Sequence, residues 1–189
     1  MGRSEPSIIV VSGIQGAGKT TVGRLLAQRF ERGVHVEADA LQRMIVSGGQ
    51  GVEGVGVISD EAGRQLRLRL RNMCLLGRSF LEAGFTAALD DIIIGFRLQH
   101  LREEMAGLPY YLVVLVPRVE VVNRRDAARG HTVGEDWGYY LDAELRKTMA
   151  GVGLWVDSSE QTPEETVHEI RRRVWSEGWI APGVQQVAG

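Results

Sequence analysis

The chain has 189 residues, of which 44% are hydrophobic, and a formal net charge of −2. This length supplies one substantial core but is too short for two ordinary domains. The near-neutral total excludes a global electrostatic attraction to nucleic acid or to an anionic membrane. We therefore predict a single domain over residues 1–180, followed by a loosely held tail at 181–189.

The first apolar run, Ile8-Ile9-Val10-Val11, is too short for a signal-peptide core or a membrane span. The single cysteine, Cys74, cannot form an intramolecular disulfide, and its apolar neighbours favour a buried, unreactive thiol. We therefore expect a cytoplasmic protein that has no membrane partner. The sequence carries no signal for its oligomeric state.

Apolar runs of strand length alternate with segments of helical periodicity along the chain. The predicted strands lie at residues 8–12, 34–38, 85–90, 110–116 and 153–157. Long helices are predicted at about 61–82 and 162–176. Such alternation is typical of an α/β fold, with a mostly parallel sheet covered by helices on both faces. A ligand of this fold binds at the carboxyl ends of the strands.

The strongest motif follows the first strand, where residues 13–20 read Gly-Ile-Gln-Gly-Ala-Gly-Lys-Thr. This is the phosphate-binding P-loop, whose backbone N–H groups surround phosphates at the start of a helix. Lys19 is expected to reach the β- and γ-phosphates of ATP, and the Thr20 hydroxyl to bind Mg²⁺. The predicted nucleotide-binding residues are Gly13, Ile14, Gln15, Gly16, Ala17, Gly18, Lys19, Thr20 and Thr21.

A dinucleotide-binding turn is the alternative interpretation of these glycines. Gly13, Gly16 and Gly18 are not spaced as G-x-G-x-x-G, and such a turn does not need a Lys-Thr pair. Recognition of guanine through Asn-Lys-x-Asp needs a second lysine, and Lys147 does not lie in such a motif. The sequence therefore favours ATP over NAD and GTP.

The predicted second strand leads to Asp39, before a short helix at about 40–45. A carboxylate at this strand end would face the P-loop, where it could accept the proton of an acceptor hydroxyl. Asp39 is thus the candidate catalytic base. The alternative is that Asp39 is a structural helix N-cap.

The predicted third strand leads into Asp90 and Asp91, which is the Walker B arrangement of apolar residues followed by a carboxylate near Mg²⁺. Either aspartate could serve the metal, and Asp90 is the first choice. No glutamate follows the pair, so the residue that activates water in motor ATPases is missing. The pattern favours phosphate transfer over ATP hydrolysis.

Two arginines downstream of the fourth strand, Arg125 and Arg129, are four residues apart and share a helix face. They could clamp the transferring phosphoryl group from a lid at about residues 125–140. The alternative is a solvated arginine face. Arg64, Arg67 and Arg71 also share a helix face and could touch a phosphate or an RNA backbone, but a charged outer face is the commoner arrangement.

With these motifs in this order, the chain resembles small P-loop kinases, most closely the chloramphenicol phosphotransferase-like group, over roughly residues 8–175. The resemblance implies a three-layer P-loop NTPase fold with a five-stranded parallel sheet of order 2-3-1-4-5 and a short lid. It also implies that Asp39 acts as base toward a small-molecule hydroxyl. Residues 44–65 differ from a chloramphenicol site, so the antibiotic itself is not implied.

The leading hypothesis is Mg²⁺-dependent transfer of the γ-phosphate of ATP to a hydroxyl of a small molecule, such as an antibiotic or a metabolite. The catalytic residues would be Asp39, Lys19, Arg125 and Arg129. A polynucleotide 5′-hydroxyl kinase is a first alternative, which the spacing of Arg43 after Asp39 and the net charge of −2 make weaker. A non-catalytic ATP-binding switch is the second.

Overall fold

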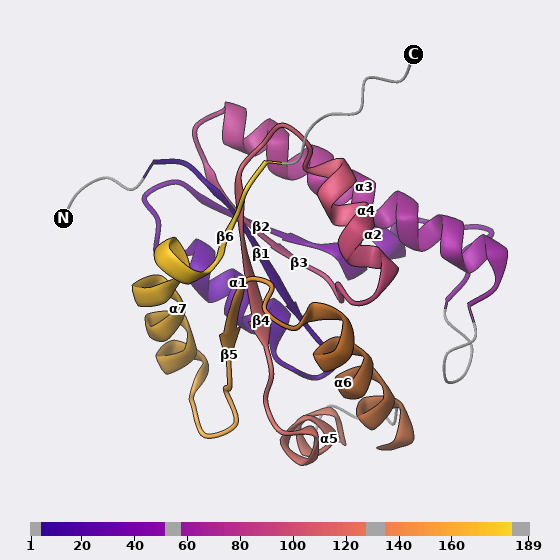
Figure 1. Cartoon of the computed structure of the whole chain (residues 1–189). Coiled ribbons are helices and arrows are strands. Elements are labelled where there is room, and N and C mark those ends of the chain that lie inside the picture. The colour runs from indigo at the N-terminus through magenta and orange to yellow at the C-terminus, as the bar shows by residue number, and fades with distance from the viewer. Residues whose placement is uncertain (1–4, 52–57, 128–134, 183–189) are drawn as a thin grey trace.

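The structure, a computed structural model, describes residues 5–51, 58–127 and 135–182. Its centre is a parallel sheet of order β2-β3-β1-β4-β5 (Figure 1). The strands are β1 Ile8–Gly13, β2 Gly33–Glu37, β3 Thr86–Asp90, β4 Tyr110–Leu115 and β5 Leu154–Val156. The five predicted strands and their order are therefore confirmed. A short additional strand, β6 Trp179–Ile180, pairs antiparallel with β4 and was not predicted.

Helices α1 and α7 pack together on one side of the sheet, and α3 and α4 on the other (Figure 1). The helices are α1 Lys19–Ala27, α2 Ala38–Arg43, α3 Asp60–Glu82, α4 Phe96–Glu104, α5 Val119–Ala127, α6 Glu135–Met149 and α7 Pro163–Glu177. Within the described ranges, no helix combines the length and the apolar character that crossing a membrane requires.

Local sequence signals explain where the elements begin. In β1, the side chains of residues 8–11 are fully buried, because helices cover both faces of a parallel sheet. The Thr162 side chain caps α7 in a capping box with Glu165, and Pro163 occupies the first turn. Ser59 caps α3 by accepting a hydrogen bond from the Ala62 N–H at 3.2 Å. These caps start both long helices within two residues of the predicted positions.

The β1 strand is also tied to the segment that follows β3. The fully buried Ser12 hydroxyl donates to the Ile93 carbonyl at 3.1 Å and accepts from the Ile93 N–H at 3.0 Å. Two hydrogen bonds on one hydroxyl hold this segment against the start of the P-loop. The carboxyl ends of β1 and β3 therefore form one rigid edge.

Cys74 on α3 is 1% exposed, and burial raises the pKa of its thiol to about 12. Because only the thiolate is nucleophilic, we expect no reaction of the native protein with a disulfide reagent at pH 8. In urea, one thiol per chain should react at once. Stoichiometric labelling of the native protein within minutes would contradict this burial.

Candidate active site

The P-loop joins β1 to α1, as predicted, and its backbone depends on glycine. Gly13, Gly16 and Gly18 have φ angles of 151°, 77° and 96°, which disfavour residues with a side chain. A Cβ atom on Gly13 would also lie 2.8 Å from the Leu115 carbonyl oxygen of β4. The first glycine of the motif is thus required by close packing, and Gly18 by the turn that starts α1.

The Lys19 side chain curls back over the loop, where its Nζ atom donates to the Ile14 carbonyl at 3.0 Å. Burial lowers the pKa of Lys19, and the negative charges of Asp90, Asp91 and Asp39 oppose this shift. The three predicted aspartates therefore lie near enough to the predicted lysine for their charges to affect its pKa. An ammonium group beside a glycine-rich helix N-terminus fits the polyphosphate of a nucleotide.

Asp90 ends β3, and its Oδ2 atom lies 2.6 Å from Nε2 of His35 on the neighbouring strand β2. The Asp90 side chain is 4% exposed and the His35 side chain 15% exposed. The imidazole thus fixes the orientation of the carboxylate. Sequence reasoning missed His35, whose signal was a polar residue inside an apolar strand.

Gly23 on α1 provides the space that this pair needs. A Cβ atom there would lie 3.0 Å from two atoms of the His35 ring and 3.6 Å from Asp90 Oδ2. A shift of the ring away from this Cβ atom would strain its hydrogen bond to Asp90. We therefore expect Gly23→Ala to lower the free energy of unfolding by about 1–3 kcal/mol, as overpacking does, in urea titrations.

Gly63→Ala is the matched control, because Gly63 is also helical and its Cβ would meet only Ile58 at an ordinary 3.7 Å. That substitution should stabilise α3 by about 0.5–1 kcal/mol, through the helix propensity of alanine. Equal changes of the free energy of unfolding in the two variants would show that the His35 ring does not need the space beside Gly23.

Asp91 has a different environment from Asp90. Its Oδ1 atom accepts from Arg69 Nη2 at 2.5 Å and from the Ile92 N–H at 2.8 Å, and its Oδ2 atom contacts Arg97 Nη2. All three charged side chains are at least nine-tenths buried. A carboxylate between two guanidinium groups is well compensated. Sequence reasoning missed both arginines. Arg69 lies among other arginines on α3, and Arg97 lies on α4, shortly after the aspartate pair.

Asp39 lies in the first turn of α2, and its side chain is 69% exposed. The N-cap of this helix is Glu37, which makes no side-chain capping bond, so the alternative reading of Asp39 as the N-cap is wrong. Its Oδ1 atom instead accepts from Arg69 Nη1 at 3.1 Å. The predicted base is thus exposed at the strand edge and linked to the Asp91 cluster.

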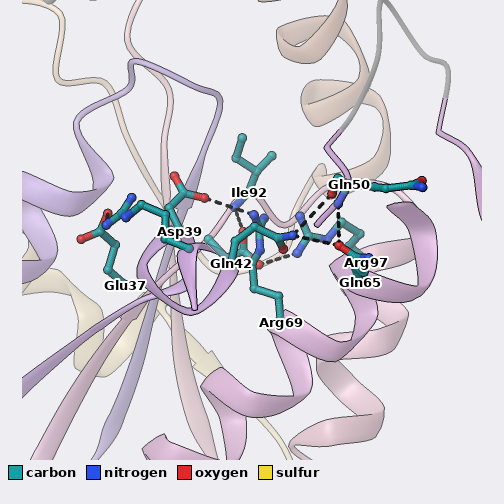
Figure 2. A network of polar contacts seen from close by, with 10 residues as sticks. Glu37, Asp39, Gln42, Gln50, Gln65, Arg69, Ile92 and Arg97 are labelled. Atoms are coloured by element: carbon teal, nitrogen blue, oxygen red, sulfur yellow. Dashed lines mark hydrogen bonds and ion pairs between the residues drawn. The ribbon is translucent and has the colours of Figure 1, made fainter. Parts of the chain in front are cut away.

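A cluster of three glutamines, Gln42, Gln50 and Gln65, lies beside these ion pairs (Figure 2). The buried Gln65 amide on α3 donates to the Gly48 carbonyl and to Glu61, each at 2.8 Å. Its Oε1 atom accepts from the Gln50 N–H at 2.8 Å and from Gln42 at 3.3 Å. One side chain therefore joins α2, the segment after α2 and α3.

One of the two arginines of the predicted lid lies in the described part of the chain. Arg125 donates to the Ser158 carbonyl at 2.9 Å, in the loop after β5, and Arg129 lies outside the described residues. Arg67 pairs with Glu103 and Glu104, and Arg64 with Glu61. The predicted charged outer face is thereby confirmed for Arg64 and Arg67.

Magnesium needs few protein ligands in such a site, because phosphate oxygens and water complete its octahedron. The oxygens of Thr20, which follows Lys19 in α1, and of Asp90 have the hard-ligand character that Mg²⁺ prefers. Both Asp91 oxygens contact arginines. In the described part of the chain, no group of three or more His, Cys, Asp and Glu residues is arranged to hold a metal.

A glycine-rich phosphate loop after β1, a β2-β3-β1-β4-β5 sheet and carboxylates after β2 and β3 define a kinase-type P-loop fold. Residues 6–175 match the sequence profile of the chloramphenicol phosphotransferase-like proteins, and the chain belongs to this family. No curated protein matches the chain.

Solved structures with the same fold include several kinases. A sugar kinase from Janibacter sp. HTCC2649 is 22% identical with a TM-score of 0.65, and the match covers 96% of this chain and 99% of that one. The tunicamycin resistance protein of Deinococcus radiodurans is 19% identical with a TM-score of 0.66, over 94% and 99% of the two chains. The APS kinase of Mycobacterium tuberculosis, solved with AMPPNP and APS, is 16% identical with a TM-score of 0.64, over 91% and 99%.

At these identities the structures establish the fold. Together with the family they indicate a P-loop kinase-type phosphotransferase.

Proposed function

We propose that this protein transfers the γ-phosphate of ATP to a hydroxyl group of a small molecule. The observation that carries the proposal is the strand order β2-β3-β1, which brings the P-loop after β1 and Asp39 after β2 to the same edge of the sheet. The negative charge of Asp39 also opposes the lowering of the Lys19 pKa. The lysine belongs to the P-loop, and the Asp39 side chain is 69% exposed and therefore accessible to an acceptor. ATP is favoured because the chain lacks the guanine-reading Asn-Lys-x-Asp motif.

Phosphate transfer needs positioning and charge neutralisation more than covalent chemistry. The P-loop N–H groups and Lys19 would hold the β- and γ-phosphates in line with the acceptor. Thr20 and Asp90 would hold Mg²⁺, which supplies neutralisation of the phosphate oxygens. Arg125 and Arg129 would add positive charge if the lid turns toward the phosphates.

Asp39 would accept a hydrogen bond from the acceptor hydroxyl and orient its oxygen toward the γ-phosphorus. As the new oxygen–phosphorus bond forms, the bond to the bridging oxygen of the β-phosphate breaks and ADP leaves. The hydroxyl proton passes to the Asp39 carboxylate and then to water. The exposure of Asp39 gives this proton a path to solvent.

The test is a transfer screen with ATP labelled at the γ-phosphate. Sugars, nucleosides and hydroxyl-bearing antibiotics are the acceptors, and an oligonucleotide with a free 5′-hydroxyl is included. The kinase and resistance proteins of the same fold motivate the first and third groups. A labelled small molecule, formed by the wild type and not by Lys19→Met, is the expected result. Hydrolysis without any labelled acceptor, or labelling of the oligonucleotide alone, would overturn the proposal.

A further inference from the structure

Four charged side chains of alternating sign run from the protein interior to the proposed base. Arg97 contacts Asp91, Asp91 contacts Arg69, and Arg69 contacts Asp39 (Figure 2). We propose that Arg69 is a positioning residue, which holds the Asp39 carboxylate in the orientation that phosphate transfer requires. This inference rests on the proposed function, because it assumes that Asp39 meets the acceptor.

The exposed fractions show which end of this row of four charged side chains is fixed. The Asp91 side chain is 1% exposed and Arg69 is 10% exposed, whereas Asp39 is 69% exposed. The buried pair is anchored in the core by Arg97 and by the Ile92 N–H. An exposed aspartate without such a partner would sample several rotamers, each reducing the share of productive complexes.

Helix α2, which carries Asp39, is short and has no side-chain cap. It has six residues, and its N-cap makes no side-chain hydrogen bond. Ala38 and Leu41 pack α2 against the core, and two side-chain hydrogen bonds join it to α3: Asp39 with Arg69 at 3.1 Å, and Gln42 with Gln65 at 3.3 Å. The Asp39 contact is the charged one of the two, and therefore the stronger.

The planar guanidinium is suited to this role. Nη1 reaches Asp39 and Nη2 reaches Asp91, so one rigid group sets the position of one carboxylate relative to the other. The Nε atom is buried without a hydrogen-bond partner among the described residues. The two carboxylates therefore determine where the guanidinium lies. The bond uses Oδ1 of Asp39, which leaves Oδ2 to face an acceptor hydroxyl.

The first experiment compares Arg69→Lys with Arg97→Lys in the full-length protein. Both variants keep a positive charge beside Asp91, but only Arg69→Lys removes the fork that also holds Asp39. We expect kcat to fall at least about tenfold in Arg69→Lys and by a distinctly smaller factor in Arg97→Lys, with ATP affinity unchanged in both. Thermal unfolding checks that both variants fold. Equal losses of kcat, or none in Arg69→Lys, would overturn the inference.

The second experiment asks whether Arg69 acts through Asp39. In an Asp39→Asn background, Arg69→Lys should cause no further loss of kcat, whereas independent effects would multiply. A multiplicative loss would show that Arg69 acts by another route, such as general stability of the site.

A third experiment needs no acceptor, so it tests this inference independently of the proposed function. Crystal structures of the wild type and of both lysine variants should show the Asp39 carboxylate displaced in Arg69→Lys and not in Arg97→Lys. If the wild type phosphorylates no acceptor, the proposed function fails, and these structures still decide whether Arg69 orients Asp39. An undisplaced carboxylate in Arg69→Lys would refute the inference.

Discussion

Asp39→Asn is expected to reduce kcat for phosphate transfer by about 10²- to 10⁴-fold, the range typical for the loss of a general base. ATP affinity, measured by calorimetry, should change by less than about twofold, because Asp39 acts on the acceptor and not on the nucleotide. The amide keeps the size of the side chain but cannot accept the hydroxyl proton. It also weakens the contact to Arg69, which loses its charge-assisted character.

Glu37→Gln is the matched control, because it removes a carboxylate two residues from Asp39 at the same strand end. Glu37 pairs with the exposed Arg43 at 3.2 Å, away from Arg69. Its replacement should leave kcat within about threefold of the wild type, as expected for a surface ion pair. Undiminished turnover in Asp39→Asn would remove Asp39 from the mechanism.

Lys19→Met is expected to weaken ATP binding by about 10- to 100-fold, since charged hydrogen bonds contribute about 1.5–3 kcal/mol. Methionine fills similar space without the ammonium group. The unliganded fold should tolerate the change well, because burial lowers the pKa of Lys19 and the charge is costly to bury. Folding lowers the pKa of Lys19, so the unfolded chain binds the proton more tightly than the folded chain does. The cost of burying this charge therefore falls, and the free energy of unfolding rises, as the pH increases toward 10.5.

Lys147 is the appropriate control, because it is the only other lysine of the chain. Its side chain is 75% exposed and pairs with Glu144 at 3.4 Å. Lys147→Met should leave ATP affinity unchanged in the same calorimetric titration. An equal affinity of Lys19→Met and the wild type would argue against a nucleotide site in the P-loop.

Much of the fold follows from local patterns. Buried parallel strands need continuous apolar runs, so each of the five strands could be placed to within two residues. The P-loop was equally visible, since its glycines, lysine and threonine are adjacent in the chain. The extra strand β6 was missed because two residues, Trp179 and Ile180, carry no periodicity.

The partners of the aspartates could not be predicted in the same way. His35 lies 55 residues before Asp90, and Arg69 lies 30 residues after Asp39 and 22 before Asp91. On α3, arginines alternate with leucines from Arg67 to Arg71, so the sequence does not mark which of them faces the sheet. Helical geometry sends Arg67 to the outer acidic pair and Arg69 to the site.

The sequence by itself determined which functional residues follow each strand. A phosphate loop follows the first strand, one carboxylate follows the second, and two carboxylates follow the third. Each of these features is made by residues that are adjacent in the chain, so the sequence shows it directly. Only the tertiary structure distinguished the two aspartates, with Asp90 held by a histidine and Asp91 by two arginines. Ion pairs between distant elements depend on how helices pack against the sheet, and that packing is a property of the whole fold.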